Sequence, residues 1–180
     1  MAALPHPRLT GGSGLSLCAG EARDVISVLA ARAAKPVTAI LIESDVTLTR
    51  RARAAATDAR LSSVQVRCGD AGALASFSDV VPVDVLMLCG VFGNIEHSQV
   101  KTVVDAIGRL ISPGGFVIWT RGASEPDRRA EIRRWFISAG LEEVFFDGAP
   151  EPYGVGMNRQ LHATAPCAIH QNSDRLFTFL

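Results

Sequence analysis

Apolar and polar positions along this chain alternate between two kinds of segment. Short runs rich in valine, isoleucine and leucine are separated by longer amphipathic stretches. Runs such as TAILI (38–42) and VLMLC (85–89) are almost wholly apolar, which is typical of strands buried on both faces of a parallel sheet. The pattern predicts strands at 14–19, 37–43, 64–69, 84–90, 115–121, 142–148 and 154–163.

The amphipathic stretches predict helices over 23–33, about 48–59, 99–110 and 126–139, with at most a short helix within 71–82. Asp45 or Thr47 is expected to cap the second helix, with Asp45 the better placed, and Gly140 is expected to end the fourth. Strand and helix in repeated alternation predict an α/β fold with a Rossmann-like, doubly wound, mostly parallel seven-stranded sheet. The link APEPYG (149–154) is too short for a parallel crossover, so the last two strands are expected to form an antiparallel hairpin.

The length of 180 residues is that of one domain. We expect a flexible N-terminal segment over 1–14, a folded domain over 15–165, and a C-terminal tail over 166–180. The end of the tail, RLFTFL (175–180), alternates as an extra strand would. Two interpretations stay open: the tail packs on its own domain, or it pairs with a second copy in a homodimer or with a missing partner.

Charge and cysteine content limit the possible partners. The 18 basic residues balance 18 acidic ones, which gives no net drive toward nucleic acid or an anionic membrane. No apolar stretch approaches the roughly 20 residues needed to cross a bilayer. The four cysteines show no C-x-x-C spacing, and the N-terminus lacks the pattern of a secretion signal. We therefore expect a reduced, cytoplasmic protein without a bound metal.

In open α/β sheets ligands bind beyond the carboxyl ends of the strands, and the first strand here is followed by CAGEARD (18–24). Gly20 lies at the turn into the helix, where a ligand can approach the backbone. The dinucleotide fingerprint requires further glycines where the chain has Cys18 and Arg23. Glu21 and Asp24 add negative charge that disfavours a pyrophosphate. A phosphate-free cofactor with a positive centre suits this loop better, and a nicotinamide oxidoreductase is the disfavoured alternative.

Two carboxylates follow the next two strands. Glu43 ends the run AILI and is placed to accept hydrogen bonds from both hydroxyls of a ribose; its alternative role is an exposed residue before the next helix. Asp70 follows a glycine at the end of the third strand, where it can accept from an exocyclic amine such as that of adenine. Together, the two carboxylates suit an adenosine.

The fourth strand leads into CGVFGNIEH (89–97), a glycine-containing loop. We expect Val91 and Phe92 to cover a flat base or an acceptor substrate. His97 is either a general base or a solvated residue at a helix start.

These segments together resemble the class I S-adenosylmethionine-dependent methyltransferases over nearly the whole chain. The likeness rests on LSLCAGEARD (15–24), ILIESD (40–45), VRCGDA (66–71), RLISPGGFVIWTRG (109–122) and IRRWFISAGLEEV (132–144). With LCGVFGNI (88–95), the sequence is especially similar to small actinobacterial-type methyltransferases. This chain departs from the family at three positions: it has Ser16 where the family usually has an acidic residue, and Cys18 and Ala22 where the family usually has glycine.

The resemblance implies an S-adenosylmethionine site and transfer of its methyl group to an unidentified small-molecule acceptor. The implied cofactor residues are Cys18, Ala19 and Gly20 along the methionine part, Glu43 and Ser44 at the ribose, Asp70 and Ala71 at the adenine, and Cys89 and Gly90 near the sulfonium. No catalytic residue is assigned. The alternative is a non-catalytic S-adenosylmethionine-binding or interaction module with the same fold. Because the first strand lies almost at the start of the sequence, we expect no helical cap before it. The site is then either open or covered in a homodimer.

Overall fold

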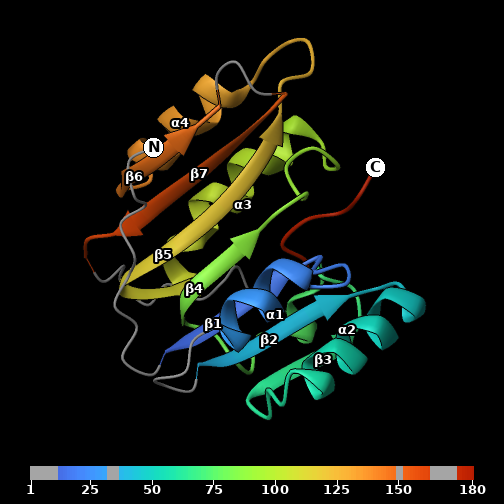
Figure 1. Cartoon of the computed structure of the whole chain (residues 1–180). Coiled ribbons are helices and arrows are strands. Elements are labelled where there is room, and N and C mark those ends of the chain that lie inside the picture. The colour runs from blue at the N-terminus through green and yellow to red at the C-terminus, as the bar shows by residue number, and fades with distance from the viewer. Residues whose placement is uncertain (1–11, 32–36, 149–151, 163–173) are drawn as a thin grey trace.

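A computed structural model describes residues 12–31, 37–148, 152–162 and 174–180 of the chain (Figure 1). The elements are β1 (Ser13–Leu17), α1 (Arg23–Ala30), β2 (Thr38–Glu43), α2 (Val46–Asp58), β3 (Val64–Cys68), η1 (Leu74–Ser76), β4 (Val83–Leu88), α3 (His97–Leu110), β5 (Ile111–Gly122), α4 (Arg129–Ser138), β6 (Leu141–Asp147) and β7 (Tyr153–Gln160). The strand and helix alternation predicted from the apolar pattern is confirmed, including the short helix η1.

The strands form one seven-stranded sheet in the order β3-β2-β1-β4-β5-β7-β6. β1 to β5 are parallel, whereas β7 runs antiparallel to both β5 and β6. The mostly parallel sheet ending in an antiparallel pair is thus confirmed. From β1 the chain first adds β2 and β3 on one side and then β4 and β5 on the other. Such a switch point opens a crevice at the carboxyl ends of the strands.

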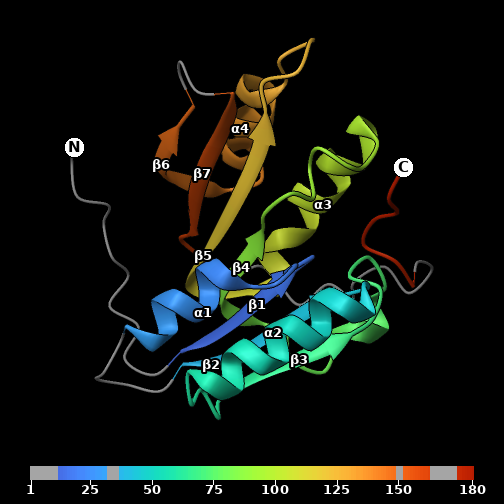
Figure 2. The same ribbon diagram turned by 45° about the vertical axis from the view of Figure 1, so that its right-hand side comes forward.

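Helices lie on both faces of the sheet, as Figures 1 and 2 show. α1 and α2 cover the half made by β3, β2 and β1, while α3 and α4 lie on the opposite face behind β4, β5 and the hairpin. The stripe predicted along α3 forms the centre of the core. Its fully buried members are Val100, Val103, Val104, Ile107 and Leu110. Burial of this stripe against the sheet fixes α3 behind the site loops.

The face that carries α1 holds an apolar groove of about 570 Å³ beside that helix. Side chains of β4, β5 and β7 line it, among them Val85, Met87, Phe116, Ile118, Val155 and Met157. Val28 of α1 stands at its side with 58% of its surface exposed, while Ile26 is the buried residue of that helix. Within the described ranges, no helix covers this part of the sheet.

The helix ends follow the predicted capping. Asp45 Oδ1 accepts hydrogen bonds from Thr47 N (2.6 Å) and Leu48 N (2.9 Å), so Asp45 is the cap of α2. Gly140 follows α4 with a φ of 81°, the left-handed conformation that ends many helices.

The segment SPGG (112–115) lies almost wholly before the strand predicted at 115–121, but the structure includes all of it in that strand. It lies within β5, which begins at Ile111 directly after α3. The pairing of β4 with β5 shifts register between Val83 and Val85, and this irregularity accommodates the segment. A Cβ atom at Gly115 would lie only 2.8 Å from Ser112 O, so the close backbone approach requires glycine there.

Gly156 of β7 provides a test of the packing around Trp119 on the neighbouring strand β5. A Cβ atom there would overlap the ring of Trp119, which is fully buried and donates from Nε1 to Asn158 Oδ1 (2.9 Å). We expect Gly156→Ala to lower the free energy of unfolding by about 1–3 kcal/mol, because the rigid indole cannot yield. Gly122→Ala, whose Cβ would lie 3.9 Å from Pro152 O, should change it by less than about 0.5 kcal/mol. Urea unfolding measures both; equal effects would contradict the packing described.

Candidate functional site

Four loops meet at the carboxyl ends of β1, β2, β3 and β4, which are neighbours in the sheet. The structure distributes the sequence-predicted cofactor residues over these loops. Cys18, Ala19 and Gly20 follow β1, Glu43 and Ser44 end and follow β2, Asp70 and Ala71 follow β3, and Cys89 and Gly90 follow β4. All of them therefore lie at one edge of the sheet.

The carboxylate of Glu43 joins the first two of these loops. Glu43 is the last residue of β2 and is buried. Its Oε2 accepts a hydrogen bond from Gly20 N (2.9 Å), and its Oε1 accepts one from Asp45 N (2.9 Å). Oε1 also accepts a long hydrogen bond from Ser44 Oγ (3.4 Å). A carboxylate oxygen can accept about two hydrogen bonds, so Oε2 keeps capacity for one more donor, and on Oε1 a ligand hydroxyl can replace the rotatable Ser44 hydroxyl. Because Glu43 is buried, the alternative interpretation of Glu43 as an exposed residue is wrong.

The loop after β1 has an unusual backbone. Cys18, Gly20 and Ala22 have φ values of 62°, 57° and 52°, all in the left-handed region. Cys18 and Ala22 stand at the two positions where the methyltransferases that the sequence resembles usually have glycine. Left-handed backbone costs a residue with a side chain roughly 1–2 kcal/mol. The loop thus keeps a glycine-type conformation although two glycines are replaced, and no atom lies within 4 Å of a Cβ built on Gly20.

Glu21 does not present an unpaired negative charge to a ligand, although we expected its charge to disfavour a pyrophosphate. Its two oxygens contact Arg51 Nη1 (2.6 Å) and Arg23 Nη2 (2.5 Å). The hydrogen bonds from Arg51 and then Arg23 hold the pKa of the Glu21 carboxyl below its ordinary value. Its negative charge is therefore balanced at the protein surface.

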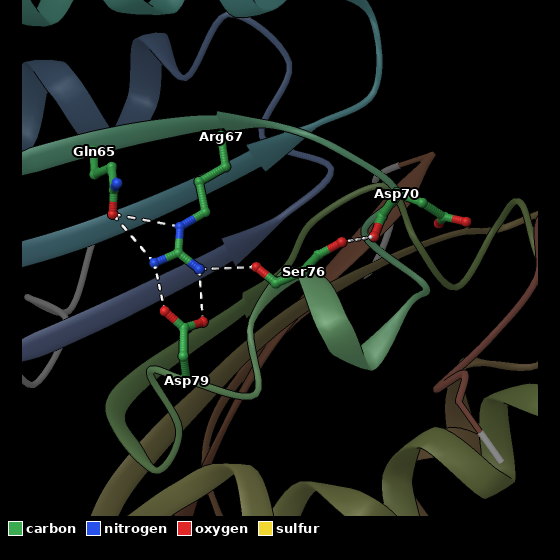
Figure 3. Close-up of polar contacts among 5 residues, drawn as sticks. All are labelled: Gln65, Arg67, Asp70, Ser76 and Asp79. Atoms are coloured by element: carbon green, nitrogen blue, oxygen red, sulfur yellow. Dashed lines mark hydrogen bonds and ion pairs between the residues drawn. The ribbon is translucent and has the colours of Figure 1, made fainter.

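The loop after β3 is held from the sheet side by Arg67, as Figure 3 shows. The guanidinium of Arg67 contacts both oxygens of Asp79 (2.7 and 2.9 Å) and donates to Ser76 O (3.0 Å). Ser76 Oγ in turn donates to the backbone oxygen of Asp70 (2.7 Å). The Asp70 side chain points away from Arg67 in this view. The network therefore fixes the loop backbone and leaves the carboxylate on the other side.

The carboxylate of Asp70 has two partners of its own. Oδ1 accepts from Gly72 N (2.8 Å), and Oδ2 contacts Arg175 Nη2 (2.7 Å). Partial burial raises the pKa of the Asp70 carboxyl, but the Gly72 amide and the Arg175 guanidinium outweigh burial and leave the pKa below its ordinary value. Asp70 is consequently an acceptor at neutral pH. The tail pattern RLFTFL gave no signal that Arg175 would contact this loop.

Cys18 lies close to both carboxylates. Burial, followed by the charges of Glu43 and Asp70, raises the pKa of the Cys18 thiol to about 12. Because the charges of both acids act on this one side chain, the loops after β1, β2 and β3 lie near one another. Burial, with a smaller effect of Asp24, likewise raises the pKa of Cys89 to about 11.

The loop after β4 corrects another expectation. Val91 and Phe92 are fully buried, and the Phe92 ring lies 6.0 Å from that of Trp119 in the core. They therefore cannot cover a flat base or an acceptor. The part of this loop that faces open space is Gly90, with a φ of 76° and no atom within 4 Å of a built Cβ. Gly90 N donates to Thr120 Oγ1 (2.9 Å), which ties the loop to β5.

His97 is the first residue of α3 and is held between two helices. Nε2 lies 2.9 Å from Glu131 Oε2, and the ring centroid lies 4.8 Å from that of Trp135. Nδ1 is buried and has no hydrogen-bond partner among the described residues. Both ring nitrogens are thus turned into the protein, which favours a structural role over that of a general base.

Several solved structures that share this fold are described as methyltransferases. An O-methyltransferase family protein from Burkholderia thailandensis is 16% identical, with a TM-score of 0.67, over 82% of this chain and 50% of its own. The S-adenosylmethionine-dependent methyltransferase SibL is 17% identical (TM-score 0.64), over 88% and 53%. An O-methyltransferase family 2 protein from Planctomyces limnophilus, solved with apigenin, is 14% identical (TM-score 0.67), over 88% and 53%. The fold of this chain is that of the class I methyltransferases.

The chain spans about half the length of these three structures. At the level of sequence, no protein-family model and no curated protein matches it. None of the helices in the described ranges has the length and apolar character needed to span a membrane. Within the same ranges, no group of three His, Cys, Asp or Glu side chains is placed to hold a metal ion.

The reactivity of the cysteine thiols tests the surroundings of Cys18. At about pH 8 a thiol with a pKa near 12 is thiolate in roughly one molecule in ten thousand, and the thiolate is the reactive form. We expect iodoacetamide to modify the exposed Cys68 before Cys18 and Cys89, as followed by peptide mass spectrometry. Labelling of Cys18 as fast as that of Cys68 would contradict the burial of Cys18 between the carboxylates.

Ala22 tests the backbone of the loop. Ala22→Gly removes a buried methyl group and adds chain entropy to the unfolded state, but it also relieves left-handed strain. We expect the free energy of unfolding to change by less than about 0.5 kcal/mol, as these contributions offset one another. Ala52→Gly is the matched control, since Ala52 is fully buried inside α2, and it should cost about 2 kcal/mol. Equal losses in urea unfolding would show that Ala22 carries no strain.

Proposed function

We propose that this chain binds S-adenosylmethionine at the carboxyl ends of β1 to β4 and transfers its methyl group to a small-molecule acceptor. The observation that carries the proposal is the buried Glu43 carboxylate, which holds the loop after β1 through Gly20 N. Its Oε2 retains acceptor capacity, and its Oε1 can exchange the long contact with Ser44 Oγ for a ligand hydroxyl. Ribose offers two adjacent hydroxyl donors, which a single carboxylate can bind together.

The remaining residues fit the other parts of the cofactor. Asp70 supplies an acceptor for the exocyclic amine of adenine, next to the small buried side chain of Ala71. Gly20 and Gly90 border open space on the loops after β1 and β4, where the methionine part and the sulfonium would lie. Ser44 follows Glu43 at the ribose, and its Oγ lies 3.4 Å from Glu43 Oε1.

S-adenosylmethionine supplies a methyl group that is already activated by a positive sulfur. The protein therefore contributes mainly by holding donor and acceptor in line, and such positioning alone supplies several kcal/mol. A general base is not required by this chemistry, in agreement with the enclosed ring nitrogens of His97.

Glu43→Gln tests the proposal. The amide keeps the size of the side chain but loses the charge and half of the acceptor capacity, so we expect S-adenosylhomocysteine to bind about ten- to a hundredfold more weakly. Glu142→Gln, an exposed carboxylate on β6, should leave the affinity unchanged. Isothermal titration calorimetry gives both affinities, and melting curves of the free proteins report whether the variants fold.

The wild-type chain has its own requirement in the same experiment. At a ligand concentration of about 100 times Kd, S-adenosylhomocysteine should stabilise the fold by about 2.7 kcal/mol. Absence of any stabilisation by either adenosyl ligand would contradict the proposal.

The alternative is a non-catalytic module that binds S-adenosylmethionine, and the observation behind it is the left-handed Cys18 and Ala22 in the loop after β1. Binding of S-adenosylmethionine without methylation of any acceptor in a panel of phenols, amines and carboxylic acids would favour the module. Methylation of one of them, detected with a labelled methyl group, would exclude it.

A further inference from the structure

The C-terminal residues 174–180, here called the C-terminal strap, cross between two of the site loops. Leu176 N donates to Gly72 O (2.7 Å) in the loop after β3. Leu180 N donates to Asn94 O (3.1 Å) in the loop after β4. Figures 1 and 2 show this terminal segment beside α3, outside the seven-stranded sheet. The strap thus connects two loops that lie on either side of the β1 loop in the strand order.

The strap is anchored in the core by two of its residues, while the others are exposed. Leu176 and Phe177 are 7% and 2% exposed and belong to the same buried cluster as Ala71. A Cβ atom at Gly72 would overlap Phe177 O, so strap and loop are in direct backbone contact. Any displacement of the strap would therefore be felt by the loop that carries Asp70.

Arg175 is the strap residue that reaches the Asp70 carboxylate, at 2.7 Å from Oδ2. Arg175 Nε also donates to Thr178 Oγ1 (3.2 Å) further along the strap, which restricts the orientation of the guanidinium. With Arg67 and Ser76 holding the backbone of the loop on the opposite side, the Asp70 loop is held from two directions.

We propose that the C-terminal strap completes the adenine end of the site, and that Arg175 is a positioning residue that directs the Asp70 carboxylate toward the exocyclic amine of the bound nucleoside. The inference rests on the proposed function and adds the origin of base specificity to it. An ionised carboxylate accepts from the amine of adenine but repels the carbonyl oxygen at the same position of hypoxanthine. Arg175 is therefore required for the preference between the two bases.

The contact with Arg175 assists a ligand rather than competing with it. The Asp70 carboxylate is contacted by Gly72 N on Oδ1 and by Arg175 Nη2 on Oδ2, with a weaker effect of the Ala73 amide. Because each oxygen can accept about two hydrogen bonds, an amine still finds a place on the carboxylate. About 44% of the Asp70 side chain is exposed, so the carboxylate is accessible from solvent.

The test compares two ligands that differ only at the base, S-adenosylhomocysteine and S-inosylhomocysteine, in which a carbonyl oxygen replaces the amine. Their affinities are measured by isothermal titration calorimetry for the full wild-type chain and for Arg175→Ala, Arg175→Lys and Arg134→Ala. Arg134 is exposed on α4 and serves as the matched control. Melting curves without ligand show whether each variant is folded.

We expect the wild type to prefer the adenine ligand by about tenfold, the effect of one charge-assisted hydrogen bond at a half-exposed site. Arg175→Ala should lower this preference to about twofold or less, mainly by weakening the binding of S-adenosylhomocysteine. Arg175→Lys should restore most of the preference because it keeps the charge, and Arg134→Ala should leave it unchanged.

Several results would overturn the inference while the proposed function stands. One is an unchanged preference in Arg175→Ala; another is an equal loss of affinity for both ligands, which would make the strap a structural support only. Equal affinity of the wild type for both ligands would show that Asp70 does not contact the amine. Failure of the wild type to bind either ligand would contradict the proposed function itself.

Gly72→Ala is a second variant that keeps the Asp70 and Arg175 side chains but displaces the strap, because its Cβ would overlap Phe177 O and would lie 3.2 Å from Arg175 Nη2. We expect it to reduce the preference as Arg175→Ala does. Retention of the full preference in a folded Gly72→Ala protein would contradict the role of the strap, whatever the result with Arg175.

Discussion

A buried carboxylate must find hydrogen-bond donors, and the site of this protein is organised around that requirement. Glu43 ends the strand β2, whose residues from Ala39 onward are all buried, so its charge emerges at the edge of the sheet with little solvent around it. The donors are backbone amides of Gly20 and Asp45. By taking both, Glu43 sets the conformation of the loop after β1 and the start of α2 together.

The same constraint explains how the loop after β1 tolerates its sequence. Gly20 N reaches Glu43 only when the chain turns sharply, and Cys18 and Ala22 on either side take left-handed conformations. Strain of this kind persists where surrounding structure holds it in place. The buried Ala22 and the partly buried Cys18 supply packing on one side, and the Glu43 carboxylate supplies the hydrogen bond on the other.

Much of the fold could be predicted from the sequence because the signals are local. Apolar runs identified the strands, and Asp45 and Gly140 marked helix ends through capping geometry that involves only neighbouring residues. The extension of β5 through SPGG could not be read locally, since it depends on the register with β4.

The candidate site divides in the same way. Glu43 and Asp70 could be placed because carboxyl ends of parallel strands meet at one edge. Val91 and Phe92 were placed wrongly, because apolar residues in a loop give no indication of whether they face the ligand or the core. The contact of Arg175 with Asp70 joins residues more than a hundred positions apart, and no pattern within the tail encodes it.

The proposed cofactor site is tested most directly by where an adenosyl ligand binds. A crystal structure of the chain with S-adenosylhomocysteine should show the ribose hydroxyls within hydrogen-bond distance of both Glu43 oxygens and the exocyclic amine on Asp70. A ligand seated elsewhere, such as in the apolar groove beside α1, with the Glu43 carboxylate bonded only to Gly20 and Asp45, would contradict it.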